Sequence, residues 1–406
     1  MSDADVLIVG GGPAGLSTAL FLLHLRPDLR GRIVVLEKAR YPRDKFCAGA
    51  IGARADRLLA SIGVTVDVPS VLVDSMSVAT RDGRAGHTVP GIGRVVRRIE
   101  FDHRLAQIAA SRGVVVVEGA RADAIDVGES GVTVATSEGS FRGRVLIGAD
   151  GVGSVVRRAL GLPFGRYRAQ VIEIDTAPIE GDPDRRTLHF DLSDPSLTGY
   201  AWDFPTLVDG RELCCRGMYE LAGIEGAPTG PEAAVPLQDR FAARLAAQGL
   251  RLADHKQKRF AERGFELHRP FAAPRVLLVG EAAGIDPITG EGIAQAVEYG
   301  HAAGAYLATR LAGADLSFAD WSRHVEGSRI GFDLGVRTRI VGLCFGARRS
   351  IMERYLLGTP SLLDAALKAW GGIKVPWTTF ARLGLATAGL LARLPFERRL
   401  GPRDQA

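Results

Sequence analysis

Three glycines near the start of the chain have the spacing of a phosphate-binding turn. Gly10, Gly12 and Gly15 form a Gly-x-Gly-x-x-Gly pattern directly after an apolar run. In such a turn, the first glycine permits a tight bend, the second lets the backbone approach a pyrophosphate, and the third lets a helix pack closely on the strand. The helix expected to follow would point its first N–H groups at the phosphates. The pattern therefore predicts a dinucleotide site, which also includes Pro13 and Ala14.

An acidic residue ends the next predicted strand, at 32–37. Glu37 follows Gly15 by about 20 residues, which is where a ribose-binding carboxylate belongs. Because a carboxylate suits a free ribose diol and repels a 2′-phosphate, the predicted nucleotide is FAD or NAD rather than NADP. Lys38 adjoins this predicted ribose site. The alternative interpretation of the whole pattern is a strand–helix–strand turn without a nucleotide.

A cysteine follows in the loop at 39–51, which should run along the cofactor. Its thiol has a reference pKa of about 8.5 and can give or take a proton at modest cost, so Cys47 is a candidate proton donor. Ala48 and Gly49 lie beside it and are expected to contact the cofactor, whereas Lys45 is expected to be solvated. The alternative interpretation is that Cys47 only fills an apolar space.

Aromatic side chains alternate with other residues in the middle of the chain. Tyr200, Trp202 and Phe204 are spaced two apart, so on a strand they share one face. Such a face is either a packed aromatic layer of the core or a wall that holds a substrate against the cofactor. The sequence alone leaves both interpretations open.

The composition is that of an ordinary globular protein. The 406 residues carry a net charge of +5, with 46% hydrophobic and 24% charged residues. This mild positive charge would suit an anionic substrate or a membrane surface, but no nucleic-acid-binding motif accompanies it. The four cysteines have no metal-ligand spacing. Because no signal peptide and no uncharged run of about 20 residues is found, a cytoplasmic protein is expected.

Three separated segments form a pattern that resembles a known superfamily. They are Gly10–Gly15, the pair Asp150 and Gly151, and the run Gly280-Glu-Ala-Ala-Gly-x-Asp-Pro-x-x-Gly290-x-Gly292. Over about 330 residues the chain resembles the FAD-dependent monooxygenase superfamily of the p-hydroxybenzoate hydroxylase fold. Within it, the chain looks most like the geranylgeranyl reductase family, on the motifs Lys45-Phe-Cys47-x-Gly49, Arg98-x-x-Phe101-Asp102 and Tyr200-x-Trp202-x-Phe204-Pro205.

This resemblance implies FAD as the cofactor and enlarges the predicted site. The segment at 280–292 places small residues beside the ribityl chain and starts a helix whose dipole can face the flavin. Glu281 stands where family members usually have aspartate and would accept a ribityl hydroxyl. The cofactor contacts implied in addition are Arg98, Asp150, Gly280, Gly290, Gly292 and Ile293. The family's cysteine lies near the flavin, so the predicted catalytic residues are Cys47, Tyr200 and Trp202.

The predicted fold class is α/β. It consists of a Rossmann-like FAD-binding domain, an inserted and mostly antiparallel substrate sheet, and a C-terminal helical region. The predicted boundaries are 1–70, 94–165 and 270–330 for the FAD-binding domain, 71–93 and 166–269 for the substrate domain, and 331–406 for the helical region. Helical structure is expected over 321–347, 360–370 and 375–394.

The function implied by the resemblance is an FAD-dependent reductase that moves hydride from the flavin to a C=C bond of an isoprenoid-like substrate. The first alternative is a monooxygenase that acts through a flavin C4a-hydroperoxide, as a hydroxylase or, less in keeping with the motifs, a halogenase. A non-catalytic flavoprotein that binds a partner is the third. Since the sequence has no second Gly-x-Gly-x-x-Gly unit, NAD(P)H must dock transiently or another donor must reduce the flavin.

The predicted partner is an apolar or aromatic small molecule, lipid-like or bound to a carrier. Apolar residues, aromatic residues and arginines mix over 374–399. Such a helix suits either peripheral contact with a membrane or packing on the substrate domain. The sequence predicts no oligomeric state.

Overall fold

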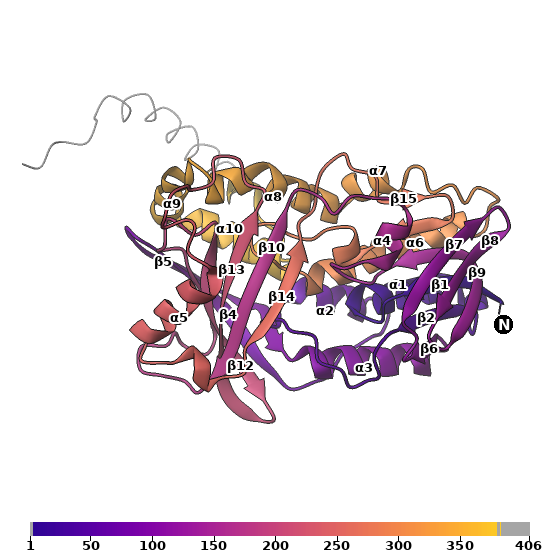
Figure 1. The fold of residues 1–406 in the computed structure, drawn as a ribbon, viewed down its shortest axis with the longest axis horizontal. Helices are drawn as coiled ribbons and strands as arrows, with labels where there is room; N and C mark the ends of the chain where they lie inside the picture. Colours follow the sequence, from indigo (N-terminus) through magenta and orange to yellow (C-terminus); the bar gives the residue numbers. More distant parts are fainter. Residues whose placement is uncertain (1–2, 380–381, 383–406) are drawn as a thin grey trace, which may run out of the picture.

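The computed structural model describes residues 3–379 and 382, which form two large β-sheets with helices packed around them (Figure 1). The predicted α/β fold class is confirmed. Most of the predicted helix at 375–394 lies outside the described residues. In the part of the chain that the structure describes, no helix is long and apolar enough to cross a membrane.

The first sheet is the Rossmann-like half of the molecule. Its order is β15-β16-β9-β1-β2-β6, and β7 and β8 extend from β9 as an antiparallel hairpin. The strands are β1 (Asp3–Val9), β2 (Ile33–Glu37), β6 (Val115–Glu118), β7 (Ala122–Gly128), β8 (Gly131–Thr136), β9 (Gly139–Gly148), β15 (Ala272–Ala273) and β16 (Val276–Leu278). The pairings of β16, β9, β1, β2 and β6 are parallel, which places the loops after β1, β2, β9 and β16 at one edge of the sheet.

Helices cover this sheet and pack on one another. They are α1 (Pro13–Leu25), α2 (Ala53–Ala60), α3 (Arg98–Ser111), α4 (Val155–Ala159) and α6 (Ile293–Arg310), with short 3-10 turns η1 (Pro27–Leu29) and η3 (Gly280–Ala282). The closest contact is between α1 and α6, where a Cβ on Gly300 would lie 2.0 Å from Ser17 Oγ. Because no side chain separates the two backbones there, the phosphate-binding turn and the helix after the second glycine-rich loop are held side by side.

The second sheet carries the predicted substrate domain. Its order is β14-β10-β13-β12-β11-β4-β5-β3, antiparallel except between β11 and β4. The strands are β3 (Ala50–Gly52), β4 (Ser70–Thr80), β5 (Gly83–Val96), β10 (Arg168–Thr176), β11 (Thr187–Asp191), β12 (Gly199–Val208), β13 (Arg211–Ala222) and β14 (Lys258–Arg263). The short strand β3 lies within the segment assigned to the FAD-binding domain, yet pairs with β5. The exact domain boundaries stay a prediction.

The two faces of the second sheet pack on different partners. Ala201 joins a cluster with Phe241 and Leu245 of α5 (Leu237–Ala247), which is followed by the turn η2 (Leu252–Asp254). The alternating residues Tyr200, Trp202 and Phe204 of β12 belong to a separate cluster that includes Leu367 of α10 (Pro360–Gly371). The prediction that these three aromatic residues share one face is therefore confirmed.

The helical region after α6 consists of α7 (Trp321–Glu326), α8 (Arg329–Phe345), α9 (Arg349–Gly358) and α10 (Pro360–Gly371). The helical structure predicted over 321–347 is confirmed, and it is divided into α7 and α8. The chain breaks at Gly327, and Ser328 caps α8 by accepting a hydrogen bond from the Gly331 N–H. The sequence prediction missed α9. The helix expected over 360–370 is confirmed as α10, which packs on β5.

Candidate active site

The phosphate-binding turn is closed at its first and third glycines and open at the second. Gly10 has a φ of 109°, which favours glycine, and a Cβ on Gly15 would lie 2.0 Å from the Gly10 carbonyl oxygen. A Cβ on Gly12, in contrast, would meet nothing closer than the Arg98 guanidinium at 3.8 Å and the Arg43 guanidinium at 4.0 Å. The turn therefore leaves space in front of two cations, as a pyrophosphate requires.

Pro13 and Ala14 begin α1 directly after this turn, and no side chain caps the helix N-terminus. The first N–H groups of a helix need an acceptor, and a phosphate is a suitable one. The predicted arrangement of strand, turn and helix is confirmed. That these residues contact a cofactor stays a prediction.

Glu37 at the end of β2 is buried and already holds the surrounding loops. Its Oε2 accepts hydrogen bonds from the Gly11 N–H at 3.0 Å and from Arg43 at 3.1 Å, and its Oε1 accepts one from the Ala39 N–H at 3.0 Å. A carboxylate has about four acceptor positions, so Oε1 keeps one for a ribose hydroxyl. Lys38 is exposed beside it.

Two arginines share one buried carboxylate below the turn. Asp102 accepts two hydrogen bonds from Arg98, both 2.7 Å long, and one from Arg43 at 2.9 Å. Although burial opposes the charge of Arg98, Asp102 outweighs burial and raises the pKa of Arg98 above its ordinary value. Arg98 therefore stays a cation next to the open side of Gly12. It forms a structural ion pair with Asp102 and also faces the predicted position of the phosphates. The sequence analysis missed Arg43.

The second glycine-rich loop, between η3 and α6, is fixed from three sides. Asp286 accepts a hydrogen bond from the Ile288 N–H at 2.7 Å and pairs with Arg337 of α8. The Tyr200 hydroxyl donates to the Thr289 carbonyl at 2.5 Å, and the Tyr219 hydroxyl donates to the Pro287 carbonyl at 3.0 Å. Because its hydroxyl is engaged in this way, Tyr200 holds the loop in place in this structure.

Positive φ angles give this loop its sharp bends, 60° at Gly280 and 64° at Gly290. Gly292 and Ile293 then lead into α6. The whole loop lies between β12, α8 and α1, so a ring system resting on it would face the aromatic side of the second sheet.

Glu281 is nearly buried, and its Oε1 atom has no hydrogen-bond partner. The nearest cation is Lys45, whose Nζ lies 3.7 Å from Glu281 Oε2. The Lys45 side chain is 37% exposed, in keeping with the expectation of solvation, and its ammonium also lies 5.4 Å from the centroid of the Phe260 ring. A ribityl hydroxyl could donate a hydrogen bond to this buried oxygen, which otherwise has no donor.

Asp150 has a local role in the structure. Its carboxylate accepts hydrogen bonds from the Ser154 hydroxyl at 2.5 Å and from the Val155 and Val156 N–H groups at 2.6 and 3.2 Å. Burial raises the pKa of Asp150, while these hydrogen bonds oppose that shift. Asp150 thus caps α4, and its predicted contact with the cofactor stays a prediction.

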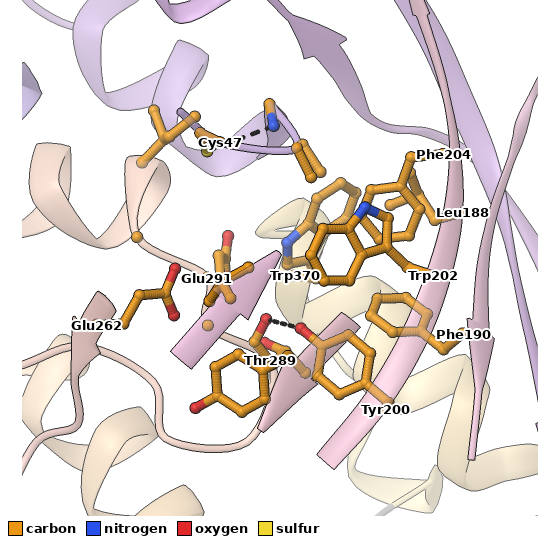
Figure 2. A pocket seen from close by; sticks show the side chains of 18 of the residues that line it. Cys47, Leu188, Phe190, Tyr200, Trp202, Phe204, Glu262, Thr289, Glu291 and Trp370 are labelled. Carbon is orange, nitrogen blue, oxygen red and sulfur yellow. Dashed lines mark hydrogen bonds between the residues drawn. The ribbon is translucent and has the colours of Figure 1, made fainter. Parts of the chain in front are cut away.

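A cavity of about 160 Å³ lies between the aromatic face of the second sheet and this glycine-rich loop (Figure 2). Its walls are mostly apolar and aromatic, and include Met76, Leu188, Phe190, Tyr200, Trp202, Phe204, Tyr219 and Trp370. Cys47, Ala48 and Gly49 line it on one side, and Glu262, Gly290 and Glu291 on another. The structure therefore brings the predicted thiol and the predicted aromatic wall into one cavity.

The Cys47 thiol is held in the cavity wall by backbone contacts. Its Sγ accepts a hydrogen bond from the Gly49 N–H at 3.4 Å, and its own N–H donates to Glu173 on β10 at 3.2 Å. Burial raises the pKa of the thiol above its ordinary value, although Arg98 and Lys45 act in the opposite direction. The thiol is thus neutral and less acidic than its reference value predicts.

Two buried glutamates near this thiol escaped the sequence analysis. Glu173 is fully buried on β10, and Glu262 lines the cavity from β14. Both lie in the predicted substrate domain at 166–269, in strands where apolar residues are expected. The sequence signal for each glutamate was a charged residue inside a predicted strand. The alternation of apolar and polar residues did not show which face of the sheet its side chain would occupy.

These features fit FAD. Gly12 leaves room for a pyrophosphate beside Arg98, Glu37 retains an acceptor for a ribose, and Glu281 presents an unpartnered oxygen. A family model described as "FAD binding domain" matches residues 3–317. The chain belongs to this family. Within the described residues, no group of histidine, cysteine, aspartate or glutamate side chains could hold a metal ion.

Known members of the FAD-binding superfamily resemble the chain over different lengths. A menaquinone reductase from Mycobacterium tuberculosis is 30% identical over 218 residues, which cover 50% of this chain and 52% of that protein. A menaquinone reductase from Mycolicibacterium smegmatis is 26% identical and covers 97% of this chain and 99% of its own. The match to the first of these relatives thus spans about half of its length.

Among solved structures, a geranylgeranyl bacteriochlorophyll reductase-like protein from Thermoplasma acidophilum has a similar fold. Its TM-score is 0.66, with 20% sequence identity, and the alignment covers 97% of this chain and 99% of that chain. This likeness confirms the fold that the resemblance to the geranylgeranyl reductase family predicted.

Proposed function

We propose that this chain is an FAD-dependent reductase that saturates a C=C bond in an apolar, isoprenoid-like substrate. The observation that carries the proposal is the cavity between the glycine-rich loop and the aromatic face of β12. Its mostly apolar and aromatic walls suit a hydrocarbon chain. The polar residues of the lining include Cys47, Glu262, Thr289, Glu291 and Arg337. FAD, when bound, would supply the hydride, after reduction by NAD(P)H or another external donor.

The residues of the chain would bind, orient and exclude water. Gly12, Arg98 and Glu37 would hold the dinucleotide, and Glu281 the ribityl chain. Tyr200 and Trp202 would form the wall against which the substrate rests, with Tyr200 also fixing the loop below it. The menaquinone reductases that resemble the chain support this substrate class, since menaquinone carries an isoprenoid side chain.

The test is single turnover without oxygen. The flavin is reduced anaerobically and mixed with a short-chain menaquinone, and the product is then exposed to air. We expect rapid flavin oxidation and a product that keeps two added hydrogens in air, since a saturated side chain persists whereas a hydroquinone ring reoxidises. A product that gains oxygen only when air is admitted during turnover would instead establish the monooxygenase alternative.

We also propose that 374–399 makes peripheral contact with a lipid surface from which such a substrate would be taken. Trp377 is 80% exposed, and Lys374 and Arg382 are exposed near it. Flotation with anionic liposomes tests the contact. Residues 380, 381 and 383–399 of this segment lie outside the described residues.

A further inference from the structure

Glu262 is a buried carboxyl group in the cavity that has no assigned role. Its residue is only 9% exposed, and its Oε2 atom is buried without a hydrogen-bond partner. The side chain points from β14 toward the glycine-rich loop (Figure 2), where a Cβ on Gly290 would lie 2.4 Å from Oε2. The carboxyl group thus rests on bare backbone next to the predicted flavin position.

Other buried acids near the cavity have charged or hydrogen-bonding partners that Glu262 lacks. Glu291, also in the cavity wall, forms an ion pair with Arg54 at 2.6 Å, and Asp286 pairs with Arg337. The charged groups that face Glu262 are Glu281, Asp286, Glu173 and Lys45. Three of these four groups are acids, so the surroundings disfavour a negative charge on Glu262.

Burial and the neighbouring Glu281 raise the pKa of Glu262 well above its ordinary value of 4.5. Lys45 acts in the opposite direction without reversing the shift. A carboxyl group whose pKa is raised keeps its proton at pH values where an ordinary glutamate has released it, and that proton can be donated. A structural role also does not explain a buried carboxyl group that has no hydrogen-bond partner in an apolar cavity.

We propose that Glu262 is the acid that delivers the proton accompanying hydride transfer to the substrate. This inference rests on the reductase function proposed above. The hydride and its electron pair, from reduced flavin, form a C–H bond to one carbon of the double bond. The π electrons pass to the other carbon, which takes the Glu262 proton. The flavin is left oxidised and is reduced again by the external donor, and the Glu262 carboxylate regains a proton from solvent.

Glu262 suits this step better than Cys47, which the sequence indicated as the proton donor. Burial raises both pKa values, but the carboxyl group starts from 4.5 and the thiol from 9.0, so the thiol moves only further above neutral pH. General acids are most effective when their pKa lies near the working pH. Cys47 then borders the reacting groups without supplying the proton.

The first experiment reads the proton directly, without turnover. Infrared difference spectra at pH 7 compare the purified wild-type protein with Glu262→Gln. We expect a C=O band of a protonated carboxyl group that shifts in D₂O and is lost in Glu262→Gln. The matched control is Glu212→Gln, because Glu212 lies in the same sheet with a side chain that is 66% exposed. Identical carboxyl bands in wild type and Glu262→Gln would overturn the proposal.

The second experiment measures the step. Reduced enzyme is mixed anaerobically with a short-chain menaquinone, and flavin oxidation is followed. We expect Glu262→Gln to slow oxidation by about a hundredfold or more while FAD affinity changes less than about threefold, and Glu262→Asp to recover part of the rate. An unchanged rate in Glu262→Gln would overturn the proposal. If wild type fails to react, the proposed function is wrong for this substrate, and the infrared result still decides whether Glu262 holds a proton.

Discussion

Glu173 Oε1 lies 3.2 Å from the backbone nitrogen of Cys47 and accepts its N–H. Glu173 belongs to β10 of the second sheet, whereas Cys47 follows β2 of the first. The carboxyl group is fully buried, and Lys258 Nζ approaches it to 3.7 Å. One hydrogen bond thus ties the loop that carries the predicted thiol to the sheet that carries the aromatic wall.

This glutamate should make stability depend on pH. Burial, opposed by Lys258, raises the pKa of Glu173 to about 7 in the folded protein, from 4.5. Between these values the folded state keeps a proton that the unfolded state has released, so the free energy of unfolding falls as pH rises. The contribution of Glu173 to the free energy of unfolding is fully present below about pH 4.5 and is lost as the pH rises through about 7.

Glu173→Gln should remove that dependence, because an amide does not titrate and its oxygen can still accept the Cys47 N–H. We expect the stability of the variant relative to wild type to increase by on the order of 2 kcal/mol between pH 5 and pH 8. Urea denaturation at both pH values measures it, with Glu212→Gln as the exposed control. Parallel changes in wild type and Glu173→Gln would contradict the assignment.

Gly12 offers a clean test of the phosphate site. Its φ of −84° suits any residue, and a Cβ would stay 3.8 Å from the nearest protein atom. Gly12→Ala and Gly12→Val should therefore fold, yet both fill space that a pyrophosphate needs. We expect flavin content to fall in Gly12→Ala and to be nearly lost in Gly12→Val, as measured by flavin absorbance of the purified proteins. Full flavin content in Gly12→Val would remove this turn from the site.

Local sequence signals predicted the parts of the fold that depend on local geometry. The glycine turn, the acid at the end of β2 and the alternating aromatic residues of β12 each combine a residue type with a fixed spacing. The Ser154 hydroxyl, which accepts the Arg157 N–H at 2.9 Å, is a further contact between residues close in the chain. Such patterns are visible in sequence because backbone conformation near them is decided by neighbours along the chain.

The rest of the site depends on contacts between distant segments. Glu262 is close to Gly290 only because β14 and the glycine-rich loop meet in space. Arg337 reaches Asp286 from α8, which follows the glycine-rich loop by about 40 residues in the chain. Neither contact produces a periodic pattern in the sequence. The sequence does not show whether a charged residue inside a strand or helix faces solvent or the core.

The ribose site predicts a graded loss of affinity. Glu37→Gln should keep an acceptor for the Ala39 N–H while losing the negative charge that faces Arg43. A charge-assisted hydrogen bond contributes about 1.5–3 kcal/mol, so FAD should bind about ten- to hundredfold more weakly. Titration of the apoprotein with FAD measures this, with Glu212→Gln as control. An unchanged dissociation constant would remove Glu37 from the ribose site.

Tyr200→Phe separates the hydroxyl of the aromatic wall from its ring. The variant loses the hydrogen bond to the Thr289 carbonyl and leaves that oxygen without its partner. We expect a loss of about 1 kcal/mol in the free energy of unfolding and weaker FAD binding, because the glycine-rich loop is no longer fixed from β12. Thermal denaturation and flavin titration measure the two effects. Wild-type values for both would mean that the loop is held by Tyr219 and Arg337 alone.

Substitution of Cys47 distinguishes the two candidate proton donors, Cys47 and Glu262. Its thiol lies in the cavity wall, and burial raises its pKa, so its loss should disturb the position of the substrate more than the supply of the proton. We therefore expect Cys47→Ala to keep FAD and to lose most turnover, about tenfold, whereas Glu262→Gln loses about a hundredfold or more. Cys47→Ser, which keeps a side chain of similar size, should recover part of the rate. The solvent isotope effect on flavin oxidation should persist in Cys47→Ala if Glu262 gives the proton. Loss of that isotope effect in Cys47→Ala, together with a rate lower than that of Glu262→Gln, would return the role of acid to the thiol.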